Sequence, residues 1–191
     1  MFSREDIKTK SKIQLSGRWG SVGGVYFLLF IMMLAVQYLP INLWLITIIL
    51  TAPLVFGEYM IGYHISRDEE VGIKDAFSGF YNLGRALGMY FWMMLWTFLW
   101  TLVFIIPGIV KAYSYSMTFY ILIDHPEMSI GEALKESIEI TKGHKVDLFL
   151  LDMSFLGWGI VSIITFGIGF FWLLPYVQAS QANAYQVLKR M

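Results

Sequence analysis

The chain has no cysteine, few histidines and little charge, and each shortage excludes a class of function. Without cysteine, its 191 residues can form no disulfide, no cysteine nucleophile and no thiolate metal site. With only three histidines (His64, His125 and His144), a histidine-rich metal site is not expected. The 14 basic and 14 acidic residues balance, so net charge provides no case for a nucleic-acid partner. We therefore expect no metal, no cofactor and no nucleic acid.

The scarcity of charge indicates a membrane protein. Only 15% of residues are charged and 57% are hydrophobic, whereas about 25% charge is usual for soluble domains. The charges also fall in blocks that leave long uncharged stretches between them, which is typical of a bilayer protein. The first apolar run follows an arm of about twenty residues and lacks a small-x-small cleavage site, so we interpret it as a retained helix.

The sequence predicts six membrane-spanning helices. Each needs about 20 mostly apolar residues, and the segments that qualify are 22–39, 41–64, 87–106, 108–125, 147–164 and 168–187. Very short turns join successive pairs at Leu39-Pro40-Ile41, Ile106-Pro107-Gly108 and Thr165-Phe166-Gly167. The predicted fold class is therefore all-α: a polytopic membrane protein built from three helical hairpins, with cytoplasmic interfacial amphipathic helices.

The basic residues predict the orientation. Thirteen of the 14 lie in the N-terminal arm, in residues 65–86 and 126–146, or at the C-terminus, and the exception is Lys111. Because cytoplasmic segments carry an excess of Lys and Arg, both termini should be cytoplasmic and the three turns should face outward.

These assignments divide one membrane domain, 1–191, into consecutive parts. They are a cytoplasmic arm (1–21), hairpin 1 (22–64), an amphipathic linker (65–86), hairpin 2 (87–125), an amphipathic helix (126–146), and hairpin 3 with a short cytoplasmic tail (147–191).

Two cytoplasmic segments share one pattern. Ser129 and Glu132 form a capping box, apolar residues then recur at helical spacing, and Gly143 supplies a C-terminal stop. The same pattern occurs 57 residues earlier, where Asp75 corresponds to Glu132. We infer a repeat of an amphipathic helix followed by a hairpin. Whether hairpin 1, with the arm at 3–18, is a third copy is left open.

The stretch from Ile106 to Trp158 carries a family resemblance. It includes Ile-Pro-Gly-Ile-Val-Lys-Ala-Tyr-Ser-Tyr-Ser-Met-Thr-Phe-Tyr-Ile-Leu-Ile-Asp-His-Pro and Ser-Ile-Gly-Glu-Ala-Leu-Lys-Glu-Ser-Ile-Glu-Ile-Thr-Lys-Gly-His-Lys. With Gly-Ile-Gly-Phe-Phe-Trp-Leu-Leu-Pro-Tyr at 167–176, it resembles the bacterial membrane family catalogued as domain of unknown function 975. The resemblance implies a multi-span protein of the bacterial plasma (inner) membrane. It implies no reaction, substrate or catalytic residue.

Three ionisable residues fall within predicted spans: Glu58, Lys111 and Asp152. Such residues are expensive in the hydrocarbon, roughly 2.5–3.5 kcal/mol each on insertion scales, and therefore need an explanation. Glu58 and Asp152 should lie at a similar depth near the cytoplasmic side. Lys111 follows an outer turn, roughly 15–20 Å from their level on straight helices, so we reject an ion pair between Lys111 and Glu58.

Polar stripes on two further helices favour a pocket in the cytoplasmic half of the bundle. Its candidate lining residues are Glu58, Asp152, Gln178, Gln181, Asn183, Tyr185, Ser114 and Thr118, with Arg85, Lys145 and Lys111 as rim charges. The alternative is that the two carboxyl groups are protonated or hydrogen-bonded and hold the helices together.

These features predict a non-enzymatic membrane protein: a transporter, an export component or a membrane assembly factor. One alternative is a membrane enzyme that acts on lipid head groups through Glu58, Asp152 and His64. Another is a subunit that docks a protein partner through the helices at 72–84 and 129–143. The bilayer is the expected partner, and a protein partner or a homo-oligomer is left open.

Overall fold

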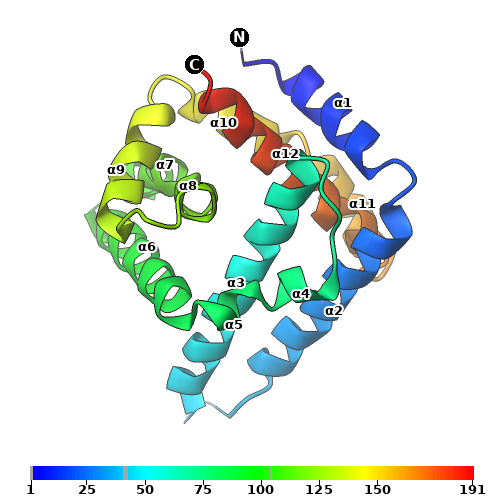
Figure 1. The fold of residues 1–191 in the computed structure, drawn as a ribbon, viewed down its shortest axis with the longest axis horizontal. Helices are drawn as coiled ribbons and strands as arrows, with labels where there is room; N and C mark the ends of the chain where they lie inside the picture. The colour runs from blue at the N-terminus through cyan, green and yellow to red at the C-terminus, as the bar shows by residue number, and fades with distance from the viewer. Residues whose placement is uncertain (1, 41–42, 104) are drawn as a thin grey trace.

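The computed structural model describes residues 2–40, 43–103 and 105–191, which form helices and no strand (Figure 1). The helices are α1 (Arg4–Leu15), α2 (Trp19–Gln37), α3 (Trp44–Ser66), α4 (Ile73–Ala76), α5 (Ser78–Tyr81), α6 (Leu83–Val103), α7 (Ile105–Tyr115), α8 (Thr118–Asp124), α9 (Ile130–Ile140), α10 (Lys145–Met153), α11 (Leu156–Ile164) and α12 (Phe170–Leu188). The predicted all-α class is confirmed for the described residues.

Helices α3 and α12 form the centre of the fold. They pack closely because Gly62 of α3 has no side chain: a Cβ there would lie 3.1 Å from the backbone oxygen of Gln178. Fully buried apolar residues occur on both helices, with Ile61 on α3 and Ala179 and Ala182 on α12. The small residues let the two backbones approach, and the larger ones remove apolar surface from solvent.

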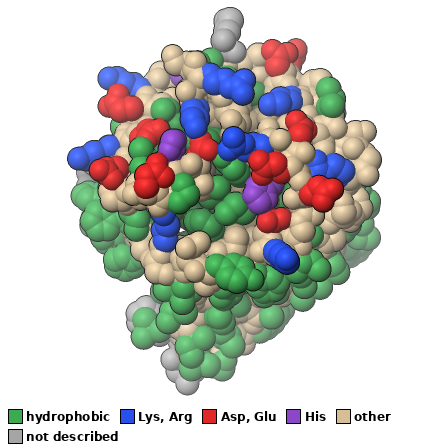
Figure 2. Space-filling model, in the orientation of Figure 1, with side chains coloured by type: hydrophobic (Ala, Val, Ile, Leu, Met, Phe, Trp, Pro, Cys, Tyr) green, Lys and Arg blue, Asp and Glu red, His purple; other side chains and the backbone are tan. Residues whose placement is uncertain are grey.

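Exposed apolar side chains gather at one end of the molecule. On α3 the large exposed ones are Leu45, Ile46 and Ile49, all early in the helix, and on the described part of α12 the sole example is Trp172. The surface of α11 is exposed and apolar over most of its length. Figure 2 shows charged side chains over the upper part of the view and apolar ones below them. We call the apolar surface of α11, the second half of α2 and the first parts of α3 and α12 the apolar belt.

Three described segments are long and apolar enough to cross a membrane: Trp19–Gln37, Leu45–Ser66 and Lys145–Ile164. They include α2, most of α3, and α10 with α11. Together with the apolar belt, they indicate a membrane protein. The predicted number of six spans stays a prediction.

The shorter helices form a collar around the other end. α1 packs on α12, α4 and α5 pack on α3, and α9 packs on α7 and α8. The approach of α4 and α5 is especially close, since a Cβ at Gly57 would overlap the backbone of Ala76 and one at Gly79 would overlap the backbone of Pro53.

The predicted capping box is confirmed at the start of α9. The Ser129 hydroxyl accepts a hydrogen bond from the Glu132 backbone N–H (3.3 Å), and the Glu132 carboxylate accepts one from the Ser129 backbone N–H (2.9 Å). The Ser129 hydroxyl also donates to the Glu132 carboxylate (2.7 Å), and this bond first and the backbone N–H second lower the pKa of Glu132. The corresponding Asp75 accepts a hydrogen bond from the Gly72 N–H (2.7 Å), so one of the two bonds of the capping box is repeated; Gly72 has no side chain to form the other. Gly143 follows α9 with a φ of +85°, as the predicted stop requires.

Two predicted spans are interrupted in the structure. The segment 108–125 is divided between α7 and α8, and the segment 147–164 between α10 and α11. A serine lies at each break: Ser116 donates to the Tyr113 carbonyl (2.9 Å) and Ser154 to the Leu151 carbonyl (2.6 Å). Such bonds compete with the helical ladder and account for the breaks.

Other boundaries differ as well. The predicted helix at 72–84 consists of α4, α5 and the start of α6, because the backbone leaves the helical conformation at Phe77 and Asn82. Pro107, in the second predicted turn, lies within α7. The third predicted turn is confirmed between α11 and α12, with Phe166 and Gly167 both at positive φ. Ile41, in the first predicted turn, lies outside the described residues.

The close approach of α4 to α3 can be tested with Gly57→Ala. The added methyl group should force the two backbones apart and destabilise the protein by about 1–3 kcal/mol, although alanine favours helices. The measurement is thermal melting in detergent, followed by tryptophan fluorescence. The control is Gly24→Ala on α2, where a Cβ has nothing within 4 Å. Equal melting temperatures for the two variants would contradict the proposed contact.

Candidate functional site

The two predicted carboxylates lie against neighbouring turns of α12. Asp152 of α10 accepts a hydrogen bond from the Gln181 amide (3.0 Å) through one oxygen and from the Tyr113 hydroxyl (3.0 Å) through the other. The phenol comes from α7, so this carboxylate joins three helices. Both donors to the Asp152 carboxylate are neutral. Gln181 was a predicted lining residue, and Tyr113 immediately precedes the predicted lining residue Ser114.

Glu58 of α3 has a similar environment one turn away. Its carboxyl group is hydrogen-bonded by the side chain of Gln178, and the Gln178 oxygen accepts a bond from the Tyr120 hydroxyl (2.9 Å). Gln178 and Gln181 are three residues apart on α12, about 4.5 Å along its axis. The predicted grouping of the two carboxylates with these two glutamines is therefore present. We call Glu58, Gln178, Asp152 and Gln181 the carboxylate–amide network.

The other predicted lining residues point elsewhere. Asn183 faces α1, where its amide donates to Ser11 (3.1 Å) and Gln14 (2.5 Å). The buried hydroxyls of Ser114 and Thr118 donate to carbonyls of their own chain segment, at 2.8 and 2.7 Å. They satisfy backbone groups and add nothing to the carboxylate–amide network.

The predicted rim charges do not surround the carboxylates. Arg85 donates to the backbone oxygens of Pro126, His125 (3.2 Å) and Met128 (2.7 Å), and so holds the loop between α8 and α9. Lys145 begins α10, seven residues before Asp152, or about 10 Å along a straight helix. Lys111 lies on α7 two residues before Tyr113, whose hydroxyl donates to Asp152, so Lys111 is nearer the level of Asp152 than the roughly 15–20 Å expected from straight helices, and that expectation was wrong.

A cluster around Asp124 was missed by the sequence analysis. At the end of α8, Asp124 accepts hydrogen bonds from Tyr63, from Tyr185 (2.9 Å), from Arg67 (3.2 Å) and from Lys189. The partners lie at the ends of α3 and α12, so three helix ends meet at one carboxylate.

A sequence signal for this cluster existed. Tyr63 and Arg67 are four residues apart, as are Tyr185 and Lys189, and both pairs end a predicted span. Side chains at that spacing share one helix face. Tyr185 had been predicted to line the pocket, and its hydroxyl is instead held by Asp124. We call Asp124 with these four partners the aspartate cluster.

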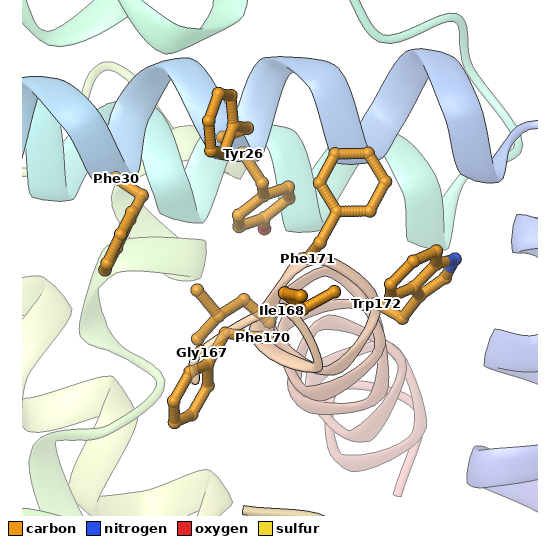
Figure 3. A pocket seen from close by; sticks show the side chains of 9 residues that line it. Tyr26, Phe30, Gly167, Ile168, Phe170, Phe171 and Trp172 are labelled. Carbon is orange, nitrogen blue, oxygen red and sulfur yellow. The ribbon is translucent and has the colours of Figure 1, made fainter. Parts of the chain in front are cut away.

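Two pockets lie in other parts of the fold. One, of about 380 Å³, is apolar and lies between α2 and the start of α12, where Phe30, Phe170, Phe171 and Trp172 surround it (Figure 3). The other, of about 300 Å³, lies between α3, α6 and α8 and contacts Tyr59. Glu58 and Asp152 line neither pocket.

The described residues indicate the general class of the protein, and the family comparison then places it more narrowly. Among the described residues, no three His, Asp or Glu side chains lie together as a metal site would require. The chain is an all-helical protein with segments long and apolar enough to cross a membrane. It belongs to the family described as Protein of unknown function (DUF975), whose model matches residues 1–114 and 102–191. The resemblance seen in the C-terminal half is thus confirmed and extends to the N-terminal half. No curated protein and no solved structure matches the chain.

The aspartate cluster predicts the effect of Asp124→Asn. The change keeps the size of the side chain but removes the negative charge from beside Arg67 and Lys189. We expect a loss of about 1–3 kcal/mol in stability, since hydrogen bonds to a charged group are replaced by weaker ones. Thermal melting in detergent measures it. The control is Glu139→Gln, which removes one exposed carboxylate from α9, and identical melting of both variants would show that the cluster contributes nothing.

Proposed function

We propose that the chain is a multi-pass protein of the bacterial plasma membrane, with six spans arranged as three hairpins and both termini in the cytoplasm. The apolar belt supports this, because it surrounds the end of the molecule where α11 turns into α12. The charged residues and both termini lie at the other end, the upper part of Figures 1 and 2. That separation of charge matches the positive-inside rule.

We propose further that the protein is a non-enzymatic transport component that binds a small cation, the proton included, at the carboxylate–amide network. The observation that carries this proposal is the pairing of two carboxyl groups with neutral partners inside a helix bundle. In the described part of the chain, the bonds to Asp152 and to the Glu58 carboxyl come from amides and a phenol. A buried negative charge without a positive partner is costly, and a bound cation would remove that cost.

The enzyme alternative has less support. His64 was the optional third member of that site, and it lies between Asp75 (3.3 Å) and Glu69 (3.5 Å) of the following linker. The docking alternative retains one supporting observation: the charged face of α9, with Glu132, Lys135 and Glu139, is exposed. An export component or assembly factor would use the same membrane arrangement with α9 as its contact surface.

The absence of cysteine makes the topology directly testable. Single substitutions Tyr38→Cys and Thr165→Cys place the one thiol of the protein near two predicted outer turns, at exposed positions. Lys10→Cys and Glu127→Cys place the single thiol in two predicted cytoplasmic segments, the N-terminal arm and residues 126–146. In intact cells, a membrane-impermeant maleimide should label the first pair at once and the second pair only after permeabilisation. Labelling of Thr165→Cys and Glu127→Cys from one side would exclude the proposed third hairpin.

Cation binding can be tested with the double variant Glu58→Gln and Asp152→Asn, which keeps side-chain size. The wild-type protein should melt roughly 5–10 °C higher with a bound cation at about 100 times its dissociation constant than in choline chloride. The probes are sodium, potassium, magnesium and calcium chloride, and protons supplied by lowering the pH.

The double variant should lose this response, and the exposed-site control Glu127→Gln with Glu139→Gln should keep it. If wild type and double variant respond alike to every cation and to pH, the carboxylates only hold the helices together. The transport proposal then fails.

A further inference from the structure

Two lysines of α1 converge on one pair of aromatic rings. Lys8 and Lys12 are one helical turn apart and lie on the same face. The Lys8 ammonium is 4.6 Å from the ring centre of Phe155, and the Lys12 ammonium is 5.7 Å from that of Tyr176. The two rings meet edge to face, with centres 5.1 Å apart. Two positive charges are therefore held over adjacent rings, at cation–π distance.

No carboxylate neutralises these charges in the described structure. Neither lysine takes part in an ion pair there, and the polar contact of Lys8 is with the Ser154 hydroxyl (3.1 Å). Burial lowers the pKa of Lys8 first, and the positive charge of Lys12 lowers it further. The like charges of Lys8 and Lys12, one helical turn apart, repel each other. An anion bound between the two ammonium groups would attract both of them.

The aromatic ring beneath Lys12 has an unused polar atom. Tyr176 is 7% exposed, and its hydroxyl has no hydrogen-bond partner in the described structure. Buried hydroxyls nearly always have a partner, so an unsatisfied one needs an explanation. A ligand with acceptor oxygens at this place would supply one.

The lysine pair lies at the border of the apolar belt. Directly after Phe155, the side chains of Leu156 (56% exposed) and Trp158 (60% exposed) begin the apolar surface of α11. On α12, the exposed Trp172 precedes Tyr176 by one turn. Positive charge immediately above an apolar surface is the arrangement that a phospholipid requires: a site for its phosphate beside a surface for its acyl chains.

We propose that Lys8 and Lys12 bind the phosphate of an anionic phospholipid whose acyl chains lie along α11. The two ammonium groups supply donors to the phosphate oxygens, and the Ser154 hydroxyl, which accepts from Lys8 and donates to the Leu151 carbonyl, holds Lys8 in position. The site sits where α1 crosses the break between α10 and α11, so a bound lipid would also fasten the N-terminal helix to the bundle. This role does not depend on the cation-binding proposal.

The test uses purified protein in mild detergent, titrated with phosphatidylglycerol or phosphatidylcholine and examined by native mass spectrometry. Wild type should retain phosphatidylglycerol in preference to phosphatidylcholine. The double variant Lys8→Gln and Lys12→Gln should bind phosphatidylglycerol roughly 10- to 30-fold more weakly, because each basic residue near a membrane surface contributes about three- to fivefold.

Two controls separate this site from net charge and from misfolding. Lys10→Gln with Lys142→Gln removes the same two charges from exposed positions outside the site and should leave the preference intact. Lys8→Arg with Lys12→Arg keeps both charges and should also retain the lipid, whether or not the glutamine variant folds.

Three outcomes would overturn the proposal. Equal retention of both lipids by wild type would show that the site does not select an anionic head group. Equal losses in the site variant and the charge-matched control would make the effect one of net charge. Displacement of the lipid by millimolar inorganic phosphate, with matching stabilisation by phosphate alone, would assign the site to a free anion.

Discussion

The close approach of backbones around α3 is the constraint on which the rest of the structure depends. Gly57 and Gly62 let α3 touch α4 on one side and α12 on another, without side chains between them. Because α12 lies so near, the carboxyl group of Glu58 can reach Gln178 and stay out of the apolar belt. A wider separation would leave that carboxyl group facing either hydrocarbon or an empty space, and both are costly.

Local features of the fold were predictable because they depend on residues close in sequence. The start of α9 was predicted from Ser129 and Glu132, which satisfy each other's backbone groups three residues apart. The pairing of Asp152 with Gln181 was predicted from depth and helical spacing, since polar groups in a bilayer protein must face inward.

What escaped prediction depends on contacts that are distant in sequence. Asn183 shares a helix with Gln178 and Gln181, but α1 packs on one side of α12 and removes Asn183 from the carboxylate–amide network. The aspartate cluster joins the ends of three helices, and no spacing within any one of them shows that they meet. The interrupted spans have a different, local cause: the hydroxyls of Ser116 and Ser154 bond carbonyls three residues earlier, and serine alone does not show where such a bond replaces the helical one.

The packing of the collar supports the proposed repeat, and we propose that the repeat includes a third copy. α4 and α5 precede the second proposed hairpin and pack on α3 of the first, whereas α9 precedes the third and packs on α7 and α8 of the second. α1 precedes the first hairpin and packs on α12 of the third, which closes the cycle. Its N-cap, Ser3, accepts a hydrogen bond from the Asp6 N–H (3.3 Å), as Ser129 does from Glu132. Three related units in a ring would bring the ends of α3, α8 and α12 together at the centre. The aspartate cluster lies where those ends meet, and the two lysines of α1 lie where the ring closes.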